Sequence, residues 1–377
     1  MVFVMPWHIS ERGGGAEVQA NYLSQALARR GFQVSYVCQT VNLNKINSIE
    51  ILNEVQVHWL KSSGRFHWVD QNKYLTKLKS IQPHVVVQRL SSNVSYVIGN
   101  YCTDNSCKFV WICTDNISPY KNYHVRKFKK SNELRSIGFI KYYSFFLNAK
   151  IMDKLRNRGM RNIDIAFTQN NEQYHILEQE FNIKSERMIS GHQKPEAISN
   201  SKTRFNERTI IWCGNFGKNK RPKLFVELTI ALQNENIKFI MIGGHSDSAY
   251  VKEVLEDKPE ALHVTGQVSF EESLNCFDNA SLLVNTSVLE GFSNTYIQAW
   301  LRGVPTVVFG ADPNEVIQKN NLGYVTDNVD DARNFINSLF EDFGSYETMS
   351  ENVKRYAIDN HTIDKMTDSF LKSIDVS

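Results

Sequence analysis

The chain has 377 residues, which is too long for one ordinary domain core and fits two domains of usual size. Its hydrophobic content of 42% and its charged content of 22% are those of a globular protein and exclude a disordered or fibrous one. The 43 basic and 40 acidic residues give a net charge of +3, so the whole molecule is not a polyanion binder and any basic surface must be local.

The chain begins with MVFVMPWHIS, which has neither a basic region nor a small-residue cleavage site. We therefore interpret it as a first strand, not as a signal peptide. No segment approaches the ~20 apolar residues of a membrane span. The six cysteines form no CxxC pair, and several lie in apolar runs, as Cys38 and Cys213 do. We expect buried, reduced thiols in a cytoplasmic protein that can touch a membrane from that side.

Short apolar, β-branched runs alternate with helical patterns from end to end. A first series of expected strands is Val2–Pro6, Gln33–Cys38, Val55–Leu60, His84–Val87, Phe109–Cys113 and Ile165–Thr168. A second series is Thr209–Trp212, Lys238–Ile242, Leu262–Val264, Leu282–Asn285 and Thr306–Phe309. Between strands the spacing is helical, as in Ala16–Arg30, with Gly31 as its C-cap. This alternation predicts an α/β fold with parallel, doubly wound sheets flanked by helices.

The two strand series are separated by the polar stretch His192–Arg208, which we interpret as a linker. The predicted domains are residues 1–191 and 192–354, with a final helix of about 355–377 packing back on the first domain. Ligands of open α/β sheets bind at the carboxyl ends of the strands. We therefore expect a cleft between the carboxyl ends of both sheets.

A glycine-rich turn, Gly13-Gly14-Gly15, joins the first strand to the first helix. Glycines let the backbone turn sharply and approach a ligand, and the helix N-terminus favours polar or negative groups. A tight strand-to-helix turn explains the same residues without a ligand. The spacing is not GxGxxG, and no acidic residue ends the second strand, so the turn does not favour NAD binding.

A second motif, Ile211–Pro222, opens the second strand series. After the strand, Gly214 and Gly217 are accompanied by Lys218, Lys220 and Arg221, just before a helix. Cations on such a loop suit a diphosphate, whose negative charge grows as its bond to a sugar breaks. A solvated basic loop is the alternative interpretation.

The third motif, Ser287–Trp300, is a strand–loop–helix that carries Glu290 beside a glycine. Asn294 is placed to cap the helix, and the N–H groups of residues 293–296 are expected to face a phosphate. Gln298, one turn further on, is expected to reach the same ligand. A carboxylate, exposed amides and a carboxamide suit a sugar at one end and a ribose at the other.

These three segments, in this order and spacing, resemble the retaining glycosyltransferases of family four, which have the two-domain GT-B fold. GGGAEVQANYLSQALARRG, FIMIGG, HVTGQV and LRGVPTVVF extend the resemblance over most of the chain. It implies an N-terminal acceptor domain, a C-terminal donor domain, a nucleotide-diphosphate-sugar donor, an α-linked product made with retention, and no metal or other cofactor.

The resemblance also implies roles for individual residues. Glu290 contacts donor-sugar hydroxyls, Lys220 neutralises the diphosphate, and Asp115 falls where the family has a His-Asp pair on the acceptor side. These three are the predicted catalytic residues. The predicted donor-binding residues are Gly14, Gly15, Gly214, Asn215, Lys220, Arg221, Gly243, Glu290, Gly291, Phe292, Ser293, Asn294, Thr295 and Gln298.

Three positions depart from the family pattern. The family's second glutamate is Gln298, the arginine after the glycine of the second motif is Asn215, and the histidine before Asp115 is Thr114. A carboxamide still accepts a ribose hydroxyl. Losing the arginine removes one phosphate cation unless Lys218 or Arg221 replaces it. No DxD motif follows a strand, and residues 327–331 (DNVDD) are interpreted as a solvated loop, so lysine and helix amides take the place of a metal.

Residues Lys121–Arg161 hold 12 Lys and Arg, interleaved with large apolar residues that include Phe128, Phe139, Tyr142, Tyr143, Phe145, Phe146 and Leu147. This composition suits an anionic membrane surface or a polyprenyl-diphosphate acceptor. The alternative is that these aromatics are core residues of the first domain's helices and that the charges lie on the solvent-exposed side of the same helices. Nucleic-acid binding is not favoured, because no recognition motif accompanies the charge.

The sequence thus predicts a retaining transferase that moves a sugar from a UDP- or GDP-sugar to a glycan or lipid-linked acceptor in bacterial polysaccharide or cell-surface glycan synthesis. Two other interpretations stay open: a sugar-nucleotide epimerase or hydrolase of the same fold, and a non-catalytic sugar-nucleotide-binding subunit of an assembly complex.

Overall fold

The computed structural model describes residues 1–62, 64, 67–130, 138–244 and 249–375. The chain divides into two compact units, each of which is described by itself. The first unit consists of residues 1–190 and 363–377, and the second of residues 191–362. The predicted division lay at 191/192 and at about 354/355. The later boundary differs because helix α14 (Phe343–Asn360) stays with the second unit and only α15 (Ile363–Ile374) joins the first.

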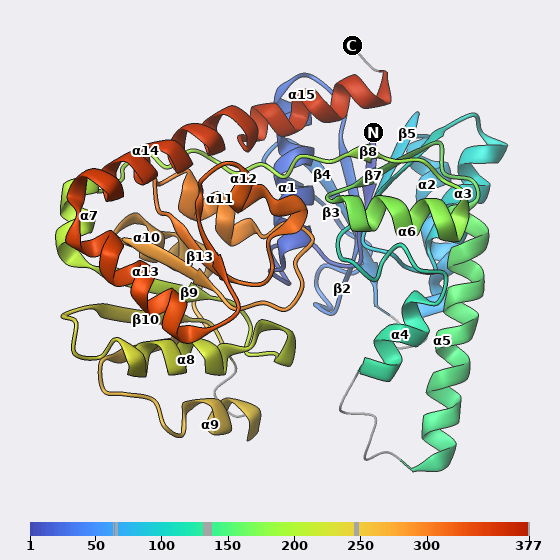
Figure 1. Ribbon diagram of the computed structural model, residues 1–377. Helices are drawn as coiled ribbons and strands as arrows, with labels where there is room; N and C mark the ends of the chain where they lie inside the picture. Colours follow the sequence, from blue (N-terminus) through green and yellow to red (C-terminus); the bar gives the residue numbers. More distant parts are fainter. Residues whose placement is uncertain (63, 65–66, 131–137, 245–248, 376–377) are drawn as a thin grey trace. The chain divides into compact units, whose positions relative to one another are not determined.

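The first unit is built on an eight-stranded sheet of order β3-β4-β2-β1-β5-β6-β7-β8 (Figure 1). All neighbours pair in parallel except β3 and β4. The strands are β1 Val2–Val4, β2 Ser35–Thr40, β3 Ile49–Leu52, β4 Val55–Lys61, β5 Val85–Arg89, β6 Lys108–Ile112, β7 Ile165–Thr168 and β8 Glu186–Arg187. The helices are α1 Gly15–Arg29, α2 Gln71–Ile81, α3 Ser95–Asp104, α4 Tyr123–Lys130, α5 Phe139–Met160 and α6 Asn171–Phe181, with the short η1 His67–Asp70.

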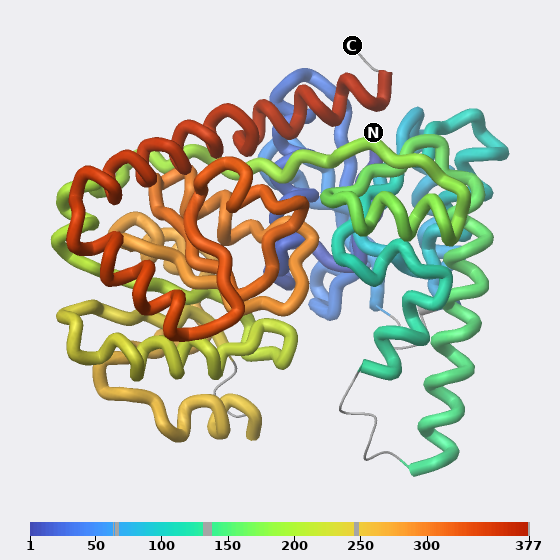
Figure 2. Tube along the Cα trace, in the orientation of Figure 1, coloured from blue at the N-terminus to red at the C-terminus, as the bar shows by residue number. Residues whose placement is uncertain are grey.

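Both faces of this sheet are covered by apolar side chains, which fits its continuous hydrophobic strands. On one face, Leu23 and Leu27 of α1 pack in the same core as Phe370 of α15. Arg30 also forms an ion pair with Asp368, 2.6 Å away. In Figure 2 the red end of the trace accordingly runs beside the blue first helix. The last helix is thus part of the first unit's core.

The second unit has a fully parallel six-stranded sheet of order β11-β10-β9-β12-β13-β14. Its strands are β9 Thr209–Cys213, β10 Lys238–Ile242, β11 Leu262–Gly266, β12 Leu282–Asn285, β13 Thr306–Phe309 and β14 Gly323–Thr326. Its helices are α7 Ser201–Glu207, α8 Pro222–Ala231, α9 Ala249–Leu255, α10 Phe270–Asp278, α11 Asn294–Trp300, α12 Val316–Lys319, α13 Val329–Glu341 and α14, with the short η3 Lys218–Lys220 and η4 Pro313–Glu315. One face packs against α8 and α13 and the other against α11 and α14.

Strand order reverses once in each sheet. In the first sheet the reversal lies between β1 and β5, and in the second between β9 and β12. At such a switch point the loops after the two adjacent strands diverge to opposite faces and leave a crevice at the carboxyl ends, which is where doubly wound folds bind ligands. The topology therefore marks four loops as candidate sites: those after β1, β5, β9 and β12.

Three of the described strands, and two of the described helices, α7 and α12, were not predicted. β3 is a short edge strand with alternate residues exposed, and β8 has only two residues. β14 begins at Gly323, whose φ of +151° and close approach to the carbonyl of Thr306 suit only glycine. Residues 201–207, expected in a polar linker, form α7, because buried Arg204 anchors them through Ser350 and the Gly303 carbonyl.

Candidate functional site

Two loops meet at the switch point of the second sheet: the lysine loop after β9 (residues 214–221) and the glutamate loop after β12 (residues 286–293). β9 ends at Cys213, and the chain then passes through η3 to Arg221, which adopts a left-handed conformation (φ +42°) before Pro222 opens α8. Proline suits the first turn of a helix, because the N–H it lacks would have no intrahelical partner. This local geometry places Lys220 and Arg221 next to the glutamate loop.

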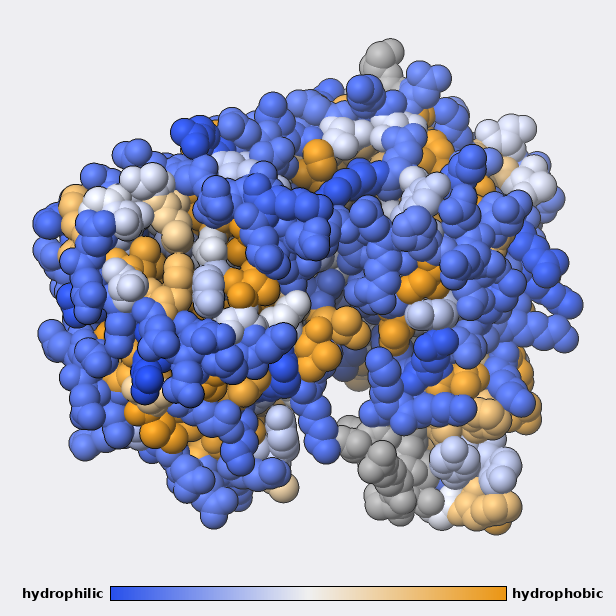
Figure 3. All heavy atoms as spheres, in the orientation of Figure 1, coloured by the Kyte–Doolittle hydropathy of each residue, from blue (hydrophilic) through white to orange (hydrophobic). Residues whose placement is uncertain are grey.

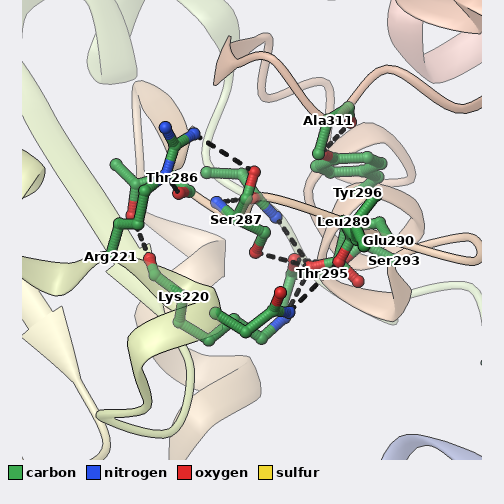
Figure 4. Close-up of polar contacts among 12 residues, drawn as sticks. Lys220, Arg221, Thr286, Ser287, Leu289, Glu290, Ser293, Thr295, Tyr296 and Ala311 are labelled. Atoms are coloured by element: carbon green, nitrogen blue, oxygen red, sulfur yellow. Dashed lines mark hydrogen bonds and ion pairs between the residues drawn. The ribbon is translucent and has the colours of Figure 1, made fainter.

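Lys220 and Glu290 form an ion pair at this junction, with 2.5 Å between Lys220 Nζ and Glu290 Oε1 (Figure 4). The same oxygen accepts from Ser287 Oγ at 2.7 Å and from Asn285 Nδ2 at 3.5 Å. Glu290 Oε2 accepts no hydrogen bond from the described residues. The Lys220 side chain is 30% exposed and the Glu290 side chain 12% exposed. One carboxylate oxygen is thus held by the protein, and the other is available to a ligand hydroxyl.

Thr286, which follows β12 directly, positions Lys220. Its hydroxyl donates to the backbone carbonyl of Lys220 at 2.5 Å and accepts from Trp212 Nε1 at 2.9 Å. Both Thr286 and Trp212 are buried. Sequence reasoning missed Thr286, although a hydroxyl residue directly after a buried strand was a signal that its side chain would serve the adjacent loop.

Arg221 is engaged with the protein backbone. Its Nε donates to the carbonyl of Thr286 at 2.7 Å, and its Nη2 donates to the carbonyl of Ser287 (Figure 4). Nη2 also donates to the carbonyl of Phe309. These bonds tie the start of α8 to the carboxyl ends of β12 and β13. Arg221 therefore has a structural role and stabilises the arrangement of the loops at the site. Lys218 is exposed, which leaves Lys220 as the cation directly paired with the glutamate loop.

The first turn of α11 differs in detail from its prediction. Ser293, not Asn294, is the N-cap residue, and its hydroxyl bonds to Thr295 Oγ1 at 2.9 Å instead of capping a backbone N–H. The N–H of Tyr296 donates to the Ser293 carbonyl at 3.2 Å, so it does not face a ligand as expected. The prediction that Asn294 caps the helix was wrong. Serine also suits an N-cap position, and it is Ser293, directly before Asn294, that adopts the extended backbone of the cap.

Asn294 instead contacts His192, a residue that sequence reasoning assigned to the linker. Their side chains share a hydrogen bond, and burial lowers the pKa of His192 to about 3 despite that bond. The backbone N–H of His192 donates to the carbonyl of His361 at 2.9 Å, and the His361 ring lies 4.8 Å from that of Phe292. The chain entering the second unit and the chain leaving it thus both support the glutamate loop.

Two of the predicted glycines are explained by close packing of the backbone. Gly243 has φ +107°, and a Cβ there would lie 2.3 Å from the carbonyl oxygen of Gly214. Gly214 in turn donates its N–H to the carbonyl of Ile242 at 3.0 Å. Gly243 and Gly214 therefore fix the loops after β9 and β10 relative to each other.

Two of the three positions that depart from the family pattern, Asn215 and Gln298, belong to the second unit and lie in different surroundings. Asn215 is exposed on the lysine loop. Gln298 is buried on α11, where its backbone carbonyl accepts from Arg302 at 3.2 Å. The exposed carboxamide of Asn215 is thus open to solvent, whereas Gln298 is part of the packed helix.

The predicted first-unit residues lie in the loops after β1 and β6. Gly14 precedes α1, and a Cβ on it would lie 2.4 Å from Glu17 Oε2, so the glycine makes room for that carboxylate. Asp115 Oδ1 accepts from the N–H groups of Ile117 and Ser118, at 3.0 and 2.6 Å, and from the Ser118 hydroxyl. This oxygen organises the turn after β6. Gly15, which begins α1, belongs to the same unit as Asp115, whereas the lysine and glutamate loops belong to the other.

The part of the chain that the structure describes holds no group of three or more His, Cys, Asp and Glu side chains arranged for a metal ion. Its six cysteines are free, four of them buried and two partly buried. Burial raises the pKa of Cys213, beside the lysine loop, to about 12. That thiol is therefore a protonated packing residue at neutral pH.

Among the described residues, no helix combines the length and apolar character needed to cross a bilayer.

Residues 207–342, which include both the lysine loop and the glutamate loop, match the family model of glycosyl transferases group 1. No curated protein sequence matches the chain.

Solved structures resemble the chain along almost its whole length. Sucrose-phosphate synthase from Thermosynechococcus elongatus has a TM-score of 0.76 at 12% identity, covering 99% of this chain and 98% of the other. HepE from Anabaena, solved with UDP and glucose, has a TM-score of 0.73 at 13% identity, with the same coverage. WaaG, a glycosyltransferase involved in lipopolysaccharide biosynthesis, has a TM-score of 0.68 at 12% identity, covering 99% of each chain. At these identities the likeness establishes the fold, which is GT-B as predicted.

Proposed function

We propose that this chain, whose residues 207–342 belong to the glycosyl transferases group 1 family, is a retaining glycosyltransferase. Its donor is a nucleotide-diphosphate sugar, either a UDP-sugar or a GDP-sugar. Its acceptor is a glycan or a lipid-linked sugar in bacterial polysaccharide or cell-surface glycan synthesis. The observation that carries the proposal is the Lys220–Glu290 pair, in which a cation and a carboxylate meet at the switch point of the second sheet.

The pair suits the two ends of such a donor. Lys220 Nζ has three N–H bonds and directs one of them at Glu290, which leaves two for the diphosphate. Glu290 Oε2 accepts from a sugar hydroxyl while Oε1 stays bonded to Ser287. As the bond between the anomeric carbon and the phosphate oxygen breaks, negative charge grows on the diphosphate next to Lys220. A preorganised cation in a partly dehydrated site stabilises that charge without reorganisation.

The transfer proceeds by front-face substitution. The acceptor oxygen forms its bond to the anomeric carbon on the face that the nucleotide leaves, so the configuration is retained. The acceptor's proton passes to the departing phosphate oxygen, which completes the balance. No metal is required in this scheme, because Lys220 supplies the positive charge. Full activity in excess EDTA is the expected result.

We also propose that α4 and α5 of the first unit bring the enzyme to the inner face of an anionic membrane, where a polyprenyl-diphosphate acceptor is presented. Figure 3 shows hydrophobic colour gathered over the first turns of α5. There Phe139 and Ile140 are 75% and 84% exposed. Between α4 and the second half of α5 lies a cavity of about 670 Å³ whose lining includes five cations, Lys121, Lys150, Lys154, Arg158 and Arg161.

Exposed apolar side chains beside clustered cations are the combination that binds anionic bilayers. Not all apolar residues of this stretch are available to a membrane. Phe128 and Met152 are buried in the core, which fits the alternative that part of the stretch is core packing. Arg135 lies outside the described residues. Cosedimentation with phosphatidylglycerol vesicles, but not with phosphatidylcholine vesicles, is expected, and Ile140→Asp should abolish it. Equal binding of the variant would overturn the membrane proposal.

The test of the transfer itself is donor consumption with and without a lipid-linked acceptor, followed by NMR assignment of the product anomer. Lys220→Ala and Glu290→Ala should each lower turnover by about 100-fold or more. Lys218→Ala is the matched control, because Lys218 is exposed on the same loop and should leave turnover within twofold. Wild-type consumption without an acceptor would identify a hydrolase or epimerase. Donor binding with no turnover under any acceptor would identify a non-catalytic binding subunit.

A further inference from the structure

The loop after β5 holds a set of buried polar atoms that have no hydrogen-bond partner among the described residues. They are Arg89 Nε and Nη1, Ser91 Oγ, and both side-chain polar atoms of Asn93. Arg89 is 2% exposed and Asn93 is fully buried. Leu90, between them, has φ +78°, a left-handed conformation that is unfavourable for a branched side chain. Unpartnered buried polar atoms and backbone strain are both costly, and where they occur together they mark sites organised for a ligand.

The location strengthens this interpretation. Arg89 is the last residue of β5, and β5 lies next to β1 at the point where strand order reverses in the first sheet. This is the topological counterpart of the Lys220–Glu290 junction in the second sheet. Switch points of doubly wound sheets are where ligands bind. The buried arginine thus lies at the position in its unit where a ligand group is expected.

Besides burial, three groups act on the pKa of Arg89: Cys113, Glu17 and Tyr36. Burial raises the pKa of the Cys113 thiol and of the Tyr36 hydroxyl, so neither carries a negative charge at neutral pH. The carboxylate that affects Arg89 is Glu17, in the first turn of α1, and Arg89 forms no ion pair with it in the described part of the chain. Glu17 is also influenced by Arg12 and Lys127, so three cations share one carboxylate. Lys127 Nζ donates to Tyr123 Oη at 2.7 Å, which holds its charge in place. Burial lowers the pKa of Arg89 to about 10, which leaves it charged at neutral pH. A buried, charged guanidinium with unused N–H groups is a strong anion-binding group.

We propose that Arg89 and the polar side chains of the loop after β5 form a subsite for an anionic group on the acceptor, a carboxylate or a phosphate. Arg89 supplies the charge, and Ser91 and Asn93 supply neutral hydrogen bonds. The proposal rests on the proposed transferase function and specifies its acceptor as an acidic sugar or a sugar phosphate. A neutral hexose would leave the buried arginine unpaired, and such sites discriminate strongly against analogues that lack the matching group.

An oxyanion at Arg89 has a second source, the diphosphate of the donor nucleotide. The two sources are separated by first saturating the protein with its nucleotide: UDP, or GDP in place of UDP throughout if only GDP stabilises the wild type. If the Arg89 subsite belongs to the acceptor, an added anion still binds in the presence of UDP. If it belongs to the donor, UDP occupies it and the added anion no longer binds.

The experiment is a thermal-shift titration of the full chain, in saturating UDP, with inorganic phosphate, glucuronate and glucose as probes. Glucuronate and glucose match in size and differ in one carboxylate. We expect glucuronate and phosphate to raise the melting temperature and glucose to leave it unchanged, because a ligand stabilises the state that binds it. Arg89→Gln should weaken glucuronate binding by about 10- to 150-fold. Arg29→Gln, an exposed arginine on the outer side of α1, is the control and should bind like the wild type.

A structural role for Arg89 predicts a different pattern. Arg89→Met removes an unpaired buried charge and preserves much of the side-chain volume, so for a ligand-binding residue the melting temperature without ligand should stay equal or rise. A lower melting temperature in Arg89→Met, or anion binding that UDP abolishes or that Arg89→Gln leaves unchanged, would overturn the proposal. Failure of both UDP and GDP to stabilise the wild type would count against the proposed transferase, which keeps the two outcomes distinct.

Discussion

Replacing Glu290 by glutamine should strengthen the binding of the free nucleotide while it impairs transfer. In the wild type, Lys220 Nζ lies 2.5 Å from Glu290 Oε1, so part of its charge is already neutralised before a diphosphate binds. Glutamine preserves the shape of the side chain and still accepts from Ser287 Oγ, but it carries no charge. The diphosphate of UDP or GDP would then meet an uncompensated lysine and one less negative charge.

The size of the effect follows from the exposure of the pair. With the lysine 30% and the glutamate 12% exposed, the pair belongs to the partly solvated class, whose members contribute up to about 1 kcal/mol. Releasing that amount to the nucleotide corresponds to roughly a fivefold lower Kd. Lys220→Met should act in the opposite direction and weaken the nucleotide by about 10- to 150-fold, the range for losing a charged hydrogen bond. Isothermal titration calorimetry at low and high salt measures both.

In Glu290→Gln, turnover of the sugar donor should change in the opposite direction to nucleotide affinity. Glu290→Gln weakens the contact with the sugar hydroxyl, so turnover should fall even as the free nucleotide binds more tightly. If Glu290→Gln weakens UDP and GDP as much as Lys220→Met does, the carboxylate holds the nucleotide itself, and the division of roles argued from Oε1 and Oε2 is refuted.

Three further outcomes follow from the same unit. Arg221→Met should lower the free energy of unfolding by about 2–4 kcal/mol in urea denaturation, since it leaves carbonyl acceptors without their donor, whereas the exposed Lys218→Met should change it by less than about 0.5 kcal/mol. Gly243→Ala should lower the free energy of unfolding by about 1–3 kcal/mol, because the φ of Gly243 is +107° and a Cβ there would collide with a carbonyl oxygen. Gly13→Ala is the control, since a Cβ on Gly13 would meet nothing within 4 Å, and it should cost much less. An equal loss of stability in both variants would contradict the steric explanation. His192 titrates near pH 6.5 when unfolded, whereas burial lowers its pKa to about 3 in the folded state, so stability is lost as the pH falls from about 6.5 towards 3, by up to about 1.4 kcal/mol per pH unit. His192→Gln should flatten that slope between pH 6.5 and 4.5, and an unchanged slope in urea midpoints would contradict the assignment.

The strands of both sheets were largely predictable, because buried parallel strands are continuous apolar runs. Lys238–Ile242 and Leu282–Asn285 were predicted with their observed ends. β3 was not predicted, since its stability comes from pairing with β4 and not from its own pattern, which leaves Ile49 and Ile51 exposed. The local sequence pattern therefore identifies a strand only when the strand is buried and its residues are accordingly apolar.

The candidate donor site was predictable as two loops but not as a set of contacts. That Lys220 pairs with Glu290 follows from β9 and β12 being neighbours, and strand order is a tertiary property. For the same reason, the sequence did not reveal that Arg221, predicted to bind the donor, donates to backbone carbonyls. His192 was assigned to a linker, because its contact with Asn294 joins residues about a hundred positions apart.

The cations of the two switch points differ in one respect that bears on specificity. Lys220 is already paired with a carboxylate in its own unit, so a ligand gains only the part of its charge that Glu290 leaves unused. Arg89 has no such pair among the described residues, and its burial makes any matching anion the stronger partner. A neutral group at Arg89 recovers none of the cost of burying that charge, whereas an anion recovers most of it. Discrimination between substrates should therefore be steeper at Arg89 than at Lys220. If the chain is the proposed transferase, its selectivity should depend more on the acceptor's charge than on the identity of the donor.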